Sequence, residues 1–300
     1  MLDPTKRFSN RVENYLKYRP RYPAAIIPLL ESECGLTRET VIADIGSGTG
    51  FMTELFLKHG NRVFGIEPNE EMRSAGERLL AKYPKFFSLN TTAETTTLPD
   101  NSMDLIIAGQ AFHWFDRQKA KVEFARILKP EGWLVLVWNG FRVESSPLMR
   151  GYQELLLRYG TDYQEVSREI EGCDIGAFFS PEKCRRARFD FKQVFDFEGL
   201  KGRLLSASYA PEQTAPRFGQ MIDELRAVFE ANQGDGTVDF DYETEVYYGQ
   251  LASRKAIASR LSSEFSRISS TIAFRSGSPD GPDERQHCAD CPLRNSWFLI

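Results

Sequence analysis

Val41-Ile42-Ala43-Asp44-Ile45-Gly46-Ser47-Gly48-Thr49-Gly50 joins a short apolar run to a glycine-rich loop. The run 41–45 has the length and the β-branched content of a buried strand, and the helical periodicity of 51–59 predicts a helix directly after the loop. A strand, a glycine loop and a helix in this order are typical of an open parallel sheet, whose ligand site lies at the carboxyl ends of its strands. We therefore expect residues 41–50 to place a ligand at that edge.

The same alternation of apolar runs and helical periodicity continues to Asn139, which predicts stacked βαβ units around a parallel sheet. Up to that point, strands are expected at 62–66, 86–89, 103–109 and 133–138, and helices from Asn69 to about Tyr83 and after Asp116. Beyond it, helices are expected at 147–159, 198–206 and 216–230, an irregular stretch at 173–181, and strands at 188–197 and 237–248. The predicted fold class is α/β, a Rossmann-like doubly wound sheet with an inserted helical cap.

Composition narrows the function classes. Lysine and arginine number 38 against 42 acidic residues, a formal charge of −4, which disfavours a sequence-independent grip on nucleic-acid phosphates. The longest apolar stretches, such as 105–108 and 133–138, fall far short of the roughly 20 residues that cross a bilayer, and the first seven residues lack the apolar core of a signal peptide. Five scattered cysteines suit reduced thiols. We expect a cytoplasmic protein without nucleic-acid or membrane partners.

The glycine loop departs from the dinucleotide-binding fingerprint. The pattern G-x-G-x-x-G would require glycine at position 51, where Phe51 stands. Asp44, two residues before the first glycine, is awkward beside a pyrophosphate and suits a ligand that carries an ammonium group.

Two acidic residues after the next strands extend the expected ligand. Glu67 ends the second strand, where a carboxylate can accept hydrogen bonds from both hydroxyls of a ribose. Glu94, beyond the third strand, either reads the edge of an adenine together with an adjacent backbone amide or is a solvated loop residue. An adenosine compound with a free ribose and a cationic end fits these residues, and S-adenosylmethionine meets each requirement.

Four segments carry a resemblance to a known family. These are residues 41–50, Gly-Ile-Glu-Pro-Asn at 65–69, Leu-Pro-Asp-Asn-Ser-Met-Asp-Leu-Ile at 98–106 and Ala-Arg-Ile-Leu-Lys-Pro-Glu-Gly-Trp at 125–133. The chain resembles the class I S-adenosylmethionine-dependent methyltransferases, in particular the small-molecule branch of type 11 that includes trans-aconitate methyltransferase-like enzymes. The opening segment 8–23 and the segment 110–116 resemble the same branch. The resemblance covers about residues 5 to 251.

The resemblance implies a seven-stranded sheet, mostly parallel with its last strand antiparallel. It further implies that the methionine and ribose parts of the cofactor lie against the glycine loop, that Glu67 holds the ribose hydroxyls, and that Ala93 with Glu94 reads adenine. Many members carry an acid where Thr92 stands, so this sequence departs from the family there. The expected cofactor-binding residues are Asp44, Gly46, Ser47, Gly48, Glu67, Pro68, Ala93, Glu94 and Gln110.

The acceptor side is expected at the same edge of the sheet. Methyl transfer needs alignment more than a catalytic triad, because the cofactor supplies the activated methyl group. His113, just past the fourth strand, is the candidate base for a hydroxyl or amine acceptor, although a histidine between two aromatic residues can equally be structural. Aromatic faces can close over a sulfonium, and arginine can bind an acidic acceptor. The expected substrate-binding residues are Tyr15, Tyr18, Arg19, Trp114, Trp138 and Asn139.

The sequence thus predicts a methyltransferase that acts on a small acidic or aromatic molecule at an O, N or C atom, as a monomer or homodimer. Two other readings stay open at this point: a protein that binds S-adenosylmethionine without turnover, as a sensor or partner subunit, and an NAD-dependent oxidoreductase, which Phe51 and Asp44 disfavour.

Three parts are expected along the chain. They are an N-terminal lid segment (1–39), a class I methyltransferase domain (40–251) with a cap insertion at about 140–185, and a low-order C-terminal tail (252–300). The tail contains His287-Cys288-Ala289-Asp290-Cys291, which lacks the second ligand pair of a structural zinc site, so no metal is expected.

Overall fold

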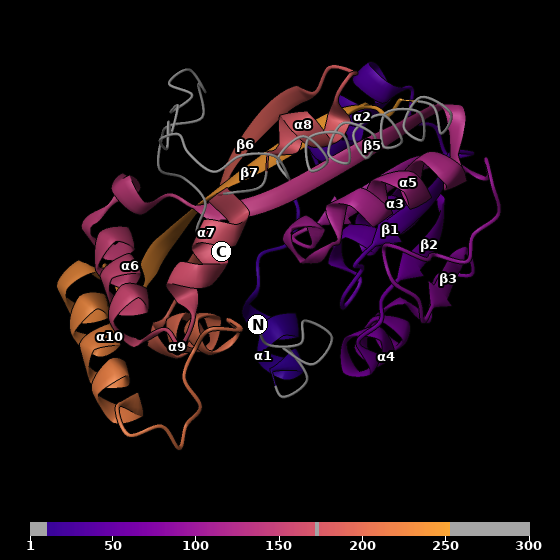
Figure 1. The fold of residues 1–300 in the computed structure, drawn as a ribbon. Coiled ribbons are helices and arrows are strands. Elements are labelled where there is room, and N and C mark those ends of the chain that lie inside the picture. Colours follow the sequence, from indigo (N-terminus) through magenta and orange to yellow (C-terminus); the bar gives the residue numbers. More distant parts are fainter. Residues whose placement is uncertain (1–10, 172–173, 253–300) are drawn as a thin grey trace, which may run out of the picture.

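The computed structural model describes residues 11–171 and 174–252, so the predicted tail lies almost entirely outside the described residues. A seven-stranded sheet with the strand order β3-β2-β1-β4-β5-β7-β6 forms the centre of the molecule (Figure 1). Five strands run parallel: β1 (Val41–Ile45), β2 (Arg62–Ile66), β3 (Phe86–Leu89), β4 (Met103–Gly109) and β5 (Leu128–Phe141). The strand β7 (Val238–Gln250) pairs antiparallel with β5 and with the edge strand β6 (Arg185–Phe195). The predicted fold class is confirmed.

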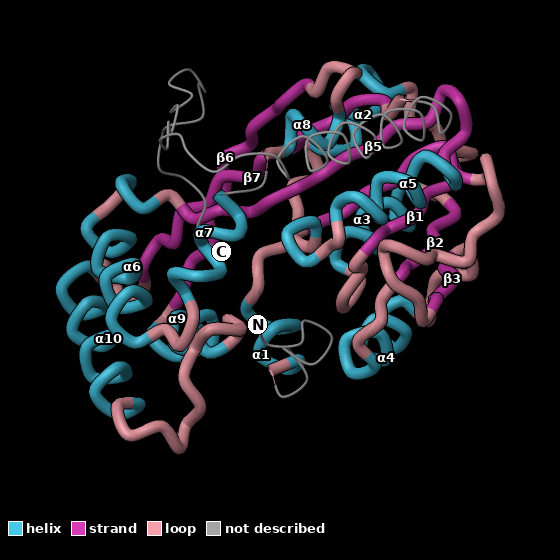
Figure 2. Tube along the Cα trace, viewed as in Figure 1, coloured by secondary structure: helices cyan, strands magenta, loops and turns pink. Residues whose placement is uncertain are grey.

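Helices cover both faces of the parallel half of the sheet, as Figure 2 shows. The helix α3 (Phe51–His59) follows β1, α4 (Glu70–Leu80) follows β2, and α5 (Arg117–Ile127) leads into β5. Local capping sets where these helices begin: the Oδ1 of Asn69 accepts a hydrogen bond from the backbone N–H of Met72, and Asp116 does the same for Lys119. Two further helices, α1 (Val12–Tyr18) and α2 (Ile26–Cys34), precede the first strand.

A second hydrophobic cluster lies beyond the carboxyl end of β5. The helices α6 (Pro147–Tyr159), α9 (Phe197–Leu205) and α10 (Phe218–Asn232) pack around the ends of β5 and β7, with Tyr152 and Phe240 fully buried between them. We call α6, α9 and α10 the cap helices. The expected cap segment, about 140–185, contains α6, whereas α9 and α10 lie after it and join the same cluster. Helix α1 packs against α9 of the cap and against α4 beside the sheet.

Several element boundaries differ from the prediction. The strand β5 is longer than the expected 133–138, because β7 pairs with it as far as Phe141, opposite Tyr242. The strand β6 begins at Arg185, which pairs with Tyr248, and not at Arg188. Helix α7 (Tyr163–Glu171) was not predicted, and the stretch expected to be irregular contains the short helix α8 (Ile175–Phe179), whose first turn is capped by Asp174. Within the described ranges, no helix is long and apolar enough to cross a membrane.

Candidate functional site

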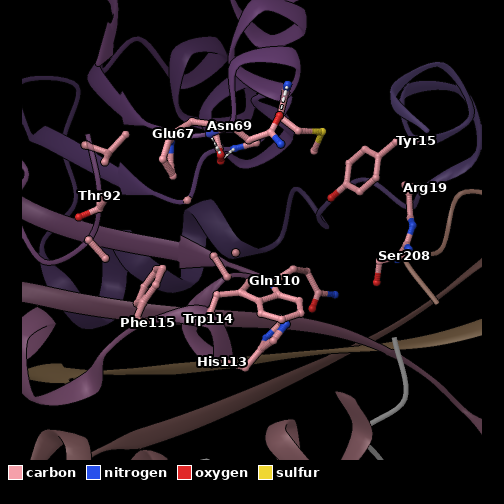
Figure 3. Close-up of a pocket in the computed structure, with 18 of the residues that line it drawn as sticks. Tyr15, Arg19, Glu67, Asn69, Thr92, Gln110, His113, Trp114, Phe115 and Ser208 are labelled. Atoms are coloured by element: carbon pink, nitrogen blue, oxygen red, sulfur yellow. Dashed lines mark hydrogen bonds between the residues drawn. The ribbon is translucent and has the colours of Figure 1, made fainter. Parts of the chain in front are cut away.

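Two adjoining cavities lie at the carboxyl ends of β1, β2 and β4. The larger has a volume of about 220 Å³ and the smaller about 40 Å³. Tyr15, Arg19, Gly46, Gly48 and Gln110 line both, so the two cavities are neighbouring parts of one site. The sheet forms one wall of the site. The opposite wall comes from Tyr15 of α1, from Arg19 directly after α1, and from Ser208 and Tyr209 after α9, as Figure 3 shows for Tyr15, Arg19 and Ser208.

The glycine loop after β1 has a backbone conformation that lets a ligand approach it closely. Gly46, Gly48 and Gly50 have φ angles of +70°, +55° and +85°, a region that side-chain-bearing residues rarely occupy. A Cβ atom at Gly46 would also clash with the Cβ of Ala111. The backbone N–H groups of Gly46 and Ser47 donate to the carbonyl of Ile66 at 2.8 and 3.0 Å, which holds the loop against the end of β2.

Glu67 is fixed by the two backbone segments on either side of it. Its Oε2 accepts a hydrogen bond from the N–H of Gly48 and its Oε1 from the N–H of Asn69, both at 2.8 Å. Its side chain is almost fully buried, and this burial raises the pKa of the carboxyl group. Each carboxylate oxygen can accept a further hydrogen bond, and Glu67 lines the larger cavity, so this carboxylate could accept hydrogen bonds from two ribose hydroxyls.

Asp44 lies at the smaller cavity. Its Oδ2 accepts a hydrogen bond from the hydroxyl of Thr53 at 2.5 Å, while its Oδ1 is buried and has no hydrogen-bond partner among the described residues. Burial raises the pKa of this carboxyl group to about 7. An ammonium group placed in the cavity would satisfy the Oδ1 atom and favour the ionised form.

The far end of the larger cavity is lined by Pro68, Thr92, Ala93, Glu94 and Phe115. The Oε1 of Glu94 accepts a hydrogen bond from the backbone N–H of Asp116 at 2.9 Å, which ties this loop to the start of α5. The carboxylate of Glu94 therefore also has a structural role. The flat apolar surfaces of Pro68 and Phe115 suit an aromatic ring such as adenine.

Gln110 turns the chain sharply after β4. It has a φ angle of +59°, its N–H donates to the carbonyl of Val137, and its Nε2 donates to the carbonyl of Asn139 at 2.9 Å. This turn leads into a short 3-10 helix that presents His113 and Trp114 to the larger cavity, with their ring centroids 4.5 Å apart. Asn139 lines the smaller cavity, and its Oδ1 accepts a hydrogen bond from Thr244 at 2.6 Å.

Two predicted substrate-binding residues lie outside both cavities. Trp138 is only 1% exposed and lies in the core, where its ring makes edge contacts with Phe112 and Tyr247. It follows the pleat of β5 to the opposite side from Asn139. Tyr18 packs against Gly202 of α9 and helps to join α1 to the cap. The other predicted site residues all line one of the two cavities.

Several residues that line the smaller cavity were not predicted, among them Thr49 and Arg203. Thr49 lies within the glycine loop itself, so proximity to the motif was a signal for it. Arg203 is contributed by α9, about 150 residues further along the chain, and is 1% exposed. Nothing in its local sequence distinguishes it from an exposed helical arginine. Within the described ranges, no cluster of three or more histidine, cysteine, aspartate or glutamate side chains could hold a metal ion.

The geometry fits an adenosine carrying an α-amino acid. The buried Oδ1 of Asp44 matches an ammonium, the Glu67 carboxylate matches a ribose, and the glycine loop leaves room for both because no Cβ fills it.

Comparison with known proteins finds similarity to methyltransferases. A family model described as a methyltransferase domain of type 11 matches residues 43–136. The chain is 28% identical over 247 residues to an uncharacterised methyltransferase-like protein of Schizosaccharomyces pombe, which covers 81% of this chain and 94% of the relative. It is 36% identical over 158 residues to an uncharacterised methyltransferase of Mycobacterium tuberculosis, covering 53% of this chain and 62% of the relative.

The fold is shared with solved structures. A candidate type II methyltransferase from Anaeromyxobacter dehalogenans superimposes with a TM-score of 0.61 at 23% sequence identity, covering 79% of this chain and 99% of that protein. Residues 43–136 therefore match a type 11 methyltransferase domain, the chain shares its fold with a solved methyltransferase, and S-adenosylmethionine is the cofactor that this family implies.

Proposed function

We propose that this protein transfers the methyl group of S-adenosylmethionine to a small acidic or aromatic molecule held between the sheet and the cap. The observation that carries the proposal is the extent of the larger cavity. It continues past the cofactor residues to Tyr15, Arg19, Trp114, Ser208 and Tyr209, which come from the N-terminal segment, the turn after β4 and the cap. The proposed place of the methyl acceptor is this part of the cavity, among aromatic rings and an arginine.

The proposed role of these residues is alignment and exclusion of water. Bound S-adenosylmethionine supplies a methyl group that its sulfonium has already activated. Tyr15 lies at the cavity and is partly buried, and its ring lies 5.7 Å from that of Phe51 at the start of α3, so α1 closes the site against the sheet. The rings of Tyr15 and Trp114 offer π faces to a cationic centre. Holding the two reacting groups in line is the main contribution that such a site makes to the rate.

His113 is proposed as the residue that receives a proton when the acceptor is a hydroxyl or an amine. It lines the larger cavity from the turn after β4. A carboxylate acceptor is already ionised and needs no base, so His113→Asn would leave its methylation nearly unchanged. For a hydroxyl or amine acceptor the same change is expected to lower kcat by about 10²- to 10⁴-fold.

Methyl-labelled S-adenosylmethionine mixed with a small-molecule metabolite extract tests the proposal. The wild-type protein is expected to produce a labelled small molecule, whereas the Gly46→Arg variant, whose glycine loop is blocked, produces none. Cofactor binding without any labelled product would overturn the enzymatic proposal and favour a sensor or partner subunit. Label found only in protein or nucleic acid would overturn the choice of acceptor class.

A further inference from the structure

An irregular segment after α9 forms part of the wall that faces the sheet across the larger cavity. The helix ends at Leu205, and turns and bends follow until α10 begins at Phe218. We call residues 205–212 the wall segment, because Ser208 and Tyr209 within it line the larger cavity. A segment of this kind has no regular hydrogen-bond ladder, so its backbone carbonyl groups depend on donors from other parts of the chain.

Arg11, which directly precedes α1, donates to three of these carbonyl groups. Its Nη1 donates to the carbonyls of Leu205 and Ala207 at 3.3 and 2.8 Å, and its Nη2 donates to the carbonyl of Ala210 at 2.7 Å. The same Nη2 pairs with the carboxylate of Glu212 at 3.0 Å. A guanidinium carries five N–H donors in one plane, so a single side chain can bind several carbonyl groups of an irregular segment.

The carbonyl bonds of Arg11 are enclosed, whereas its ion pair is open to water. The side chain of Arg11 is 10% exposed and that of Glu212 is 61% exposed. An ion pair with an exposed partner contributes little to stability, while hydrogen bonds from a charged donor are stronger than neutral ones. The three bonds to backbone carbonyls, and not the ion pair, are therefore the contacts through which Arg11 holds the wall segment.

The two cavity-lining residues of the wall segment are supported differently. The backbone N–H and the hydroxyl of Thr161, just before α7, both donate to the carbonyl of Tyr209, at 2.9 and 3.2 Å. Ser208 directly follows Ala207, whose carbonyl accepts the bond from Arg11. Tyr209 is thus also anchored from the α7 side, and the position of Ser208 depends more on Arg11.

Helix α1 and the end of α9 are fitted to each other beyond Arg11 itself. A Cβ atom at Gly202 would clash with the ring of Tyr18, so α9 comes close to α1 where it has no side chain. The Nε of Arg19 donates to the hydroxyl of Ser206 at 3.0 Å. Arg11 lines neither cavity, so any effect it has on a ligand acts through the wall segment.

We propose that Arg11 is a positioning residue for the methyl acceptor, because it fixes the wall segment and thereby places Ser208 and Tyr209 at the larger cavity. This role rests on the proposed function, which puts the acceptor against these two residues. The contacts expected for the cofactor lie on the sheet side, where Gly48 and Glu67 hold each other. Loss of Arg11 is therefore expected to impair use of the acceptor and to spare binding of the cofactor.

Deuterium exchange of the full-length protein, measured by mass spectrometry, tests whether Arg11 holds the wall segment. Arg11→Met keeps an unbranched apolar side chain but removes every donor. The amide groups of the wall segment should exchange about tenfold faster or more in this variant, because the charge-assisted hydrogen bonds that hold the segment are lost. The amide groups of α10 should exchange as in the wild type, which shows that the cap stays folded.

Three further variants separate the carbonyl bonds from charge and from general stability. Arg11→Lys keeps the charge but replaces the planar donor set with one ammonium group, so its exchange should be intermediate. Glu212→Gln removes the ion pair and leaves the three carbonyl bonds in place. Arg150→Met removes an arginine of α6 that pairs with Glu144 and lines neither cavity. The last two variants should match the wild type.

Methyl transfer tests the effect on the acceptor and works with a metabolite extract as its source. The initial rate at which the wild type's labelled product forms is measured against dilution of the extract and, separately, against the concentration of methyl-labelled S-adenosylmethionine. In Arg11→Met, the half-saturating amount of extract should rise about tenfold or more, because the wall that places the acceptor has moved. The half-saturating concentration of S-adenosylmethionine should stay within about twofold of the wild-type value.

Two results overturn the proposal. The first is unchanged exchange of the wall segment in Arg11→Met. The second is a maximal rate that falls while both half-saturating values stay unchanged, or both values rising equally, since a merely structural role acts on acceptor and cofactor alike. A wild-type protein that makes no labelled product instead contradicts the proposed function and with it the acceptor role, whereas the exchange experiment still decides whether Arg11 fixes the wall segment.

Discussion

The two walls of the site are built in different ways. The sheet wall consists of short turns that follow β1, β2 and β4. Short hydrogen bonds from backbone N–H groups hold these turns, such as the one from Gly48 to the carboxylate of Glu67. The cap wall consists of side chains that reach the cavity from α1 and α9, held by long-range contacts such as Arg19 to Ser206. We infer that the proposed ribose contact of Glu67 depends on local backbone order, whereas the positions of Arg19 and Arg203 at the cavity depend on how the cap packs against the sheet.

A change in the glycine loop is expected to have the largest effect. Gly46→Ala puts a Cβ against Ala111 in a left-handed backbone conformation. Overpacking of this kind costs about 1–3 kcal/mol and the conformation costs roughly 1–2 kcal/mol more. The loop is expected to relieve this strain by moving away from the arrangement that binds the cofactor, and a loss of about 2.7 kcal/mol of binding free energy would lower the affinity roughly a hundredfold. Calorimetry measures the loss.

Gly35→Ala is the matched control for that variant. Gly35 also has a positive φ angle, but nothing lies within 4 Å of the position that its Cβ would take. It should therefore lower stability slightly and leave cofactor affinity unchanged. Equal losses of affinity in the two variants would show that the loop acts through general stability and not through contact with the ligand.

Removing the charge of Glu67 should have the next largest effect. Glu67→Gln leaves one acceptor oxygen for two backbone N–H groups and the ribose. Hydrogen bonds to charged groups contribute about 1.5–3 kcal/mol, which predicts a loss of cofactor affinity of about 10- to 100-fold. Glu77→Gln is the control and should bind normally, because Glu77 lies on α4, is exposed, contacts Ser88 and Arg73, and lines neither cavity. Normal binding by Glu67→Gln would contradict the assignment of the ribose.

The pH dependence of cofactor binding tests the role of Asp44, which belongs to the sheet wall. The pKa of Asp44 is raised to about 7 by burial, so the ionised form that an ammonium requires increases about tenfold between pH 6 and pH 8. Cofactor affinity should rise by about that factor in the wild type, and Asp44→Asn should bind more weakly with a flatter pH profile. A wild-type profile identical in shape to that of Asp44→Asn contradicts the role of Asp44.

The same group affects stability without ligand. Because its folded pKa lies above the ordinary value of 3.8, Asp44 favours folding most below about pH 4, and this contribution is lost as the pH rises through 7. The free energy of unfolding of the wild type should therefore fall, relative to that of Asp44→Asn, between pH 4 and pH 8. Denaturant unfolding at several pH values measures the difference.

The smallest effect on binding is expected for Trp138. Its ring lies in the core, and its indole nitrogen has no hydrogen-bond partner among the described residues. Trp138→Phe should lower the free energy of unfolding by about 1–3 kcal/mol through lost packing while cofactor affinity stays within about twofold. A large loss of cofactor affinity in a stable Trp138→Phe variant would show that Trp138 contributes to binding.

The sequence was a reliable guide where function depends on local order. Residues 41–69 contain a strand, a tight turn, a helix and a second strand, so the spacing alone brought Asp44, the glycines and Glu67 to one edge. Trp138 shows the limit of this reasoning. It stands one residue from Asn139, and because neighbouring side chains of a strand point to opposite faces, only one of the two reaches the cavity.

The cap could not be placed from the sequence for a different reason. The position of Arg203 depends on how α9 packs against β7 and α1, which no local pattern encodes. A helix was correctly predicted over 198–206, against α9 at Phe197–Leu205, yet the amphipathic pattern gives only a buried face and not the cavity that this face borders. Likewise, β5 extends to Phe141 only because β7 is long enough to pair with it.

Calorimetric titration of the full-length protein with S-adenosylhomocysteine, and separately with NAD, tests most directly that this edge of the sheet is a site for an adenosyl amino acid. We predict one-to-one binding of S-adenosylhomocysteine, no binding of NAD, and loss of binding in the double variant Gly46→Arg/Glu67→Ala with its thermal unfolding still cooperative. Absence of S-adenosylhomocysteine binding to the wild type, or its survival in the double variant, would contradict the assignment of the site.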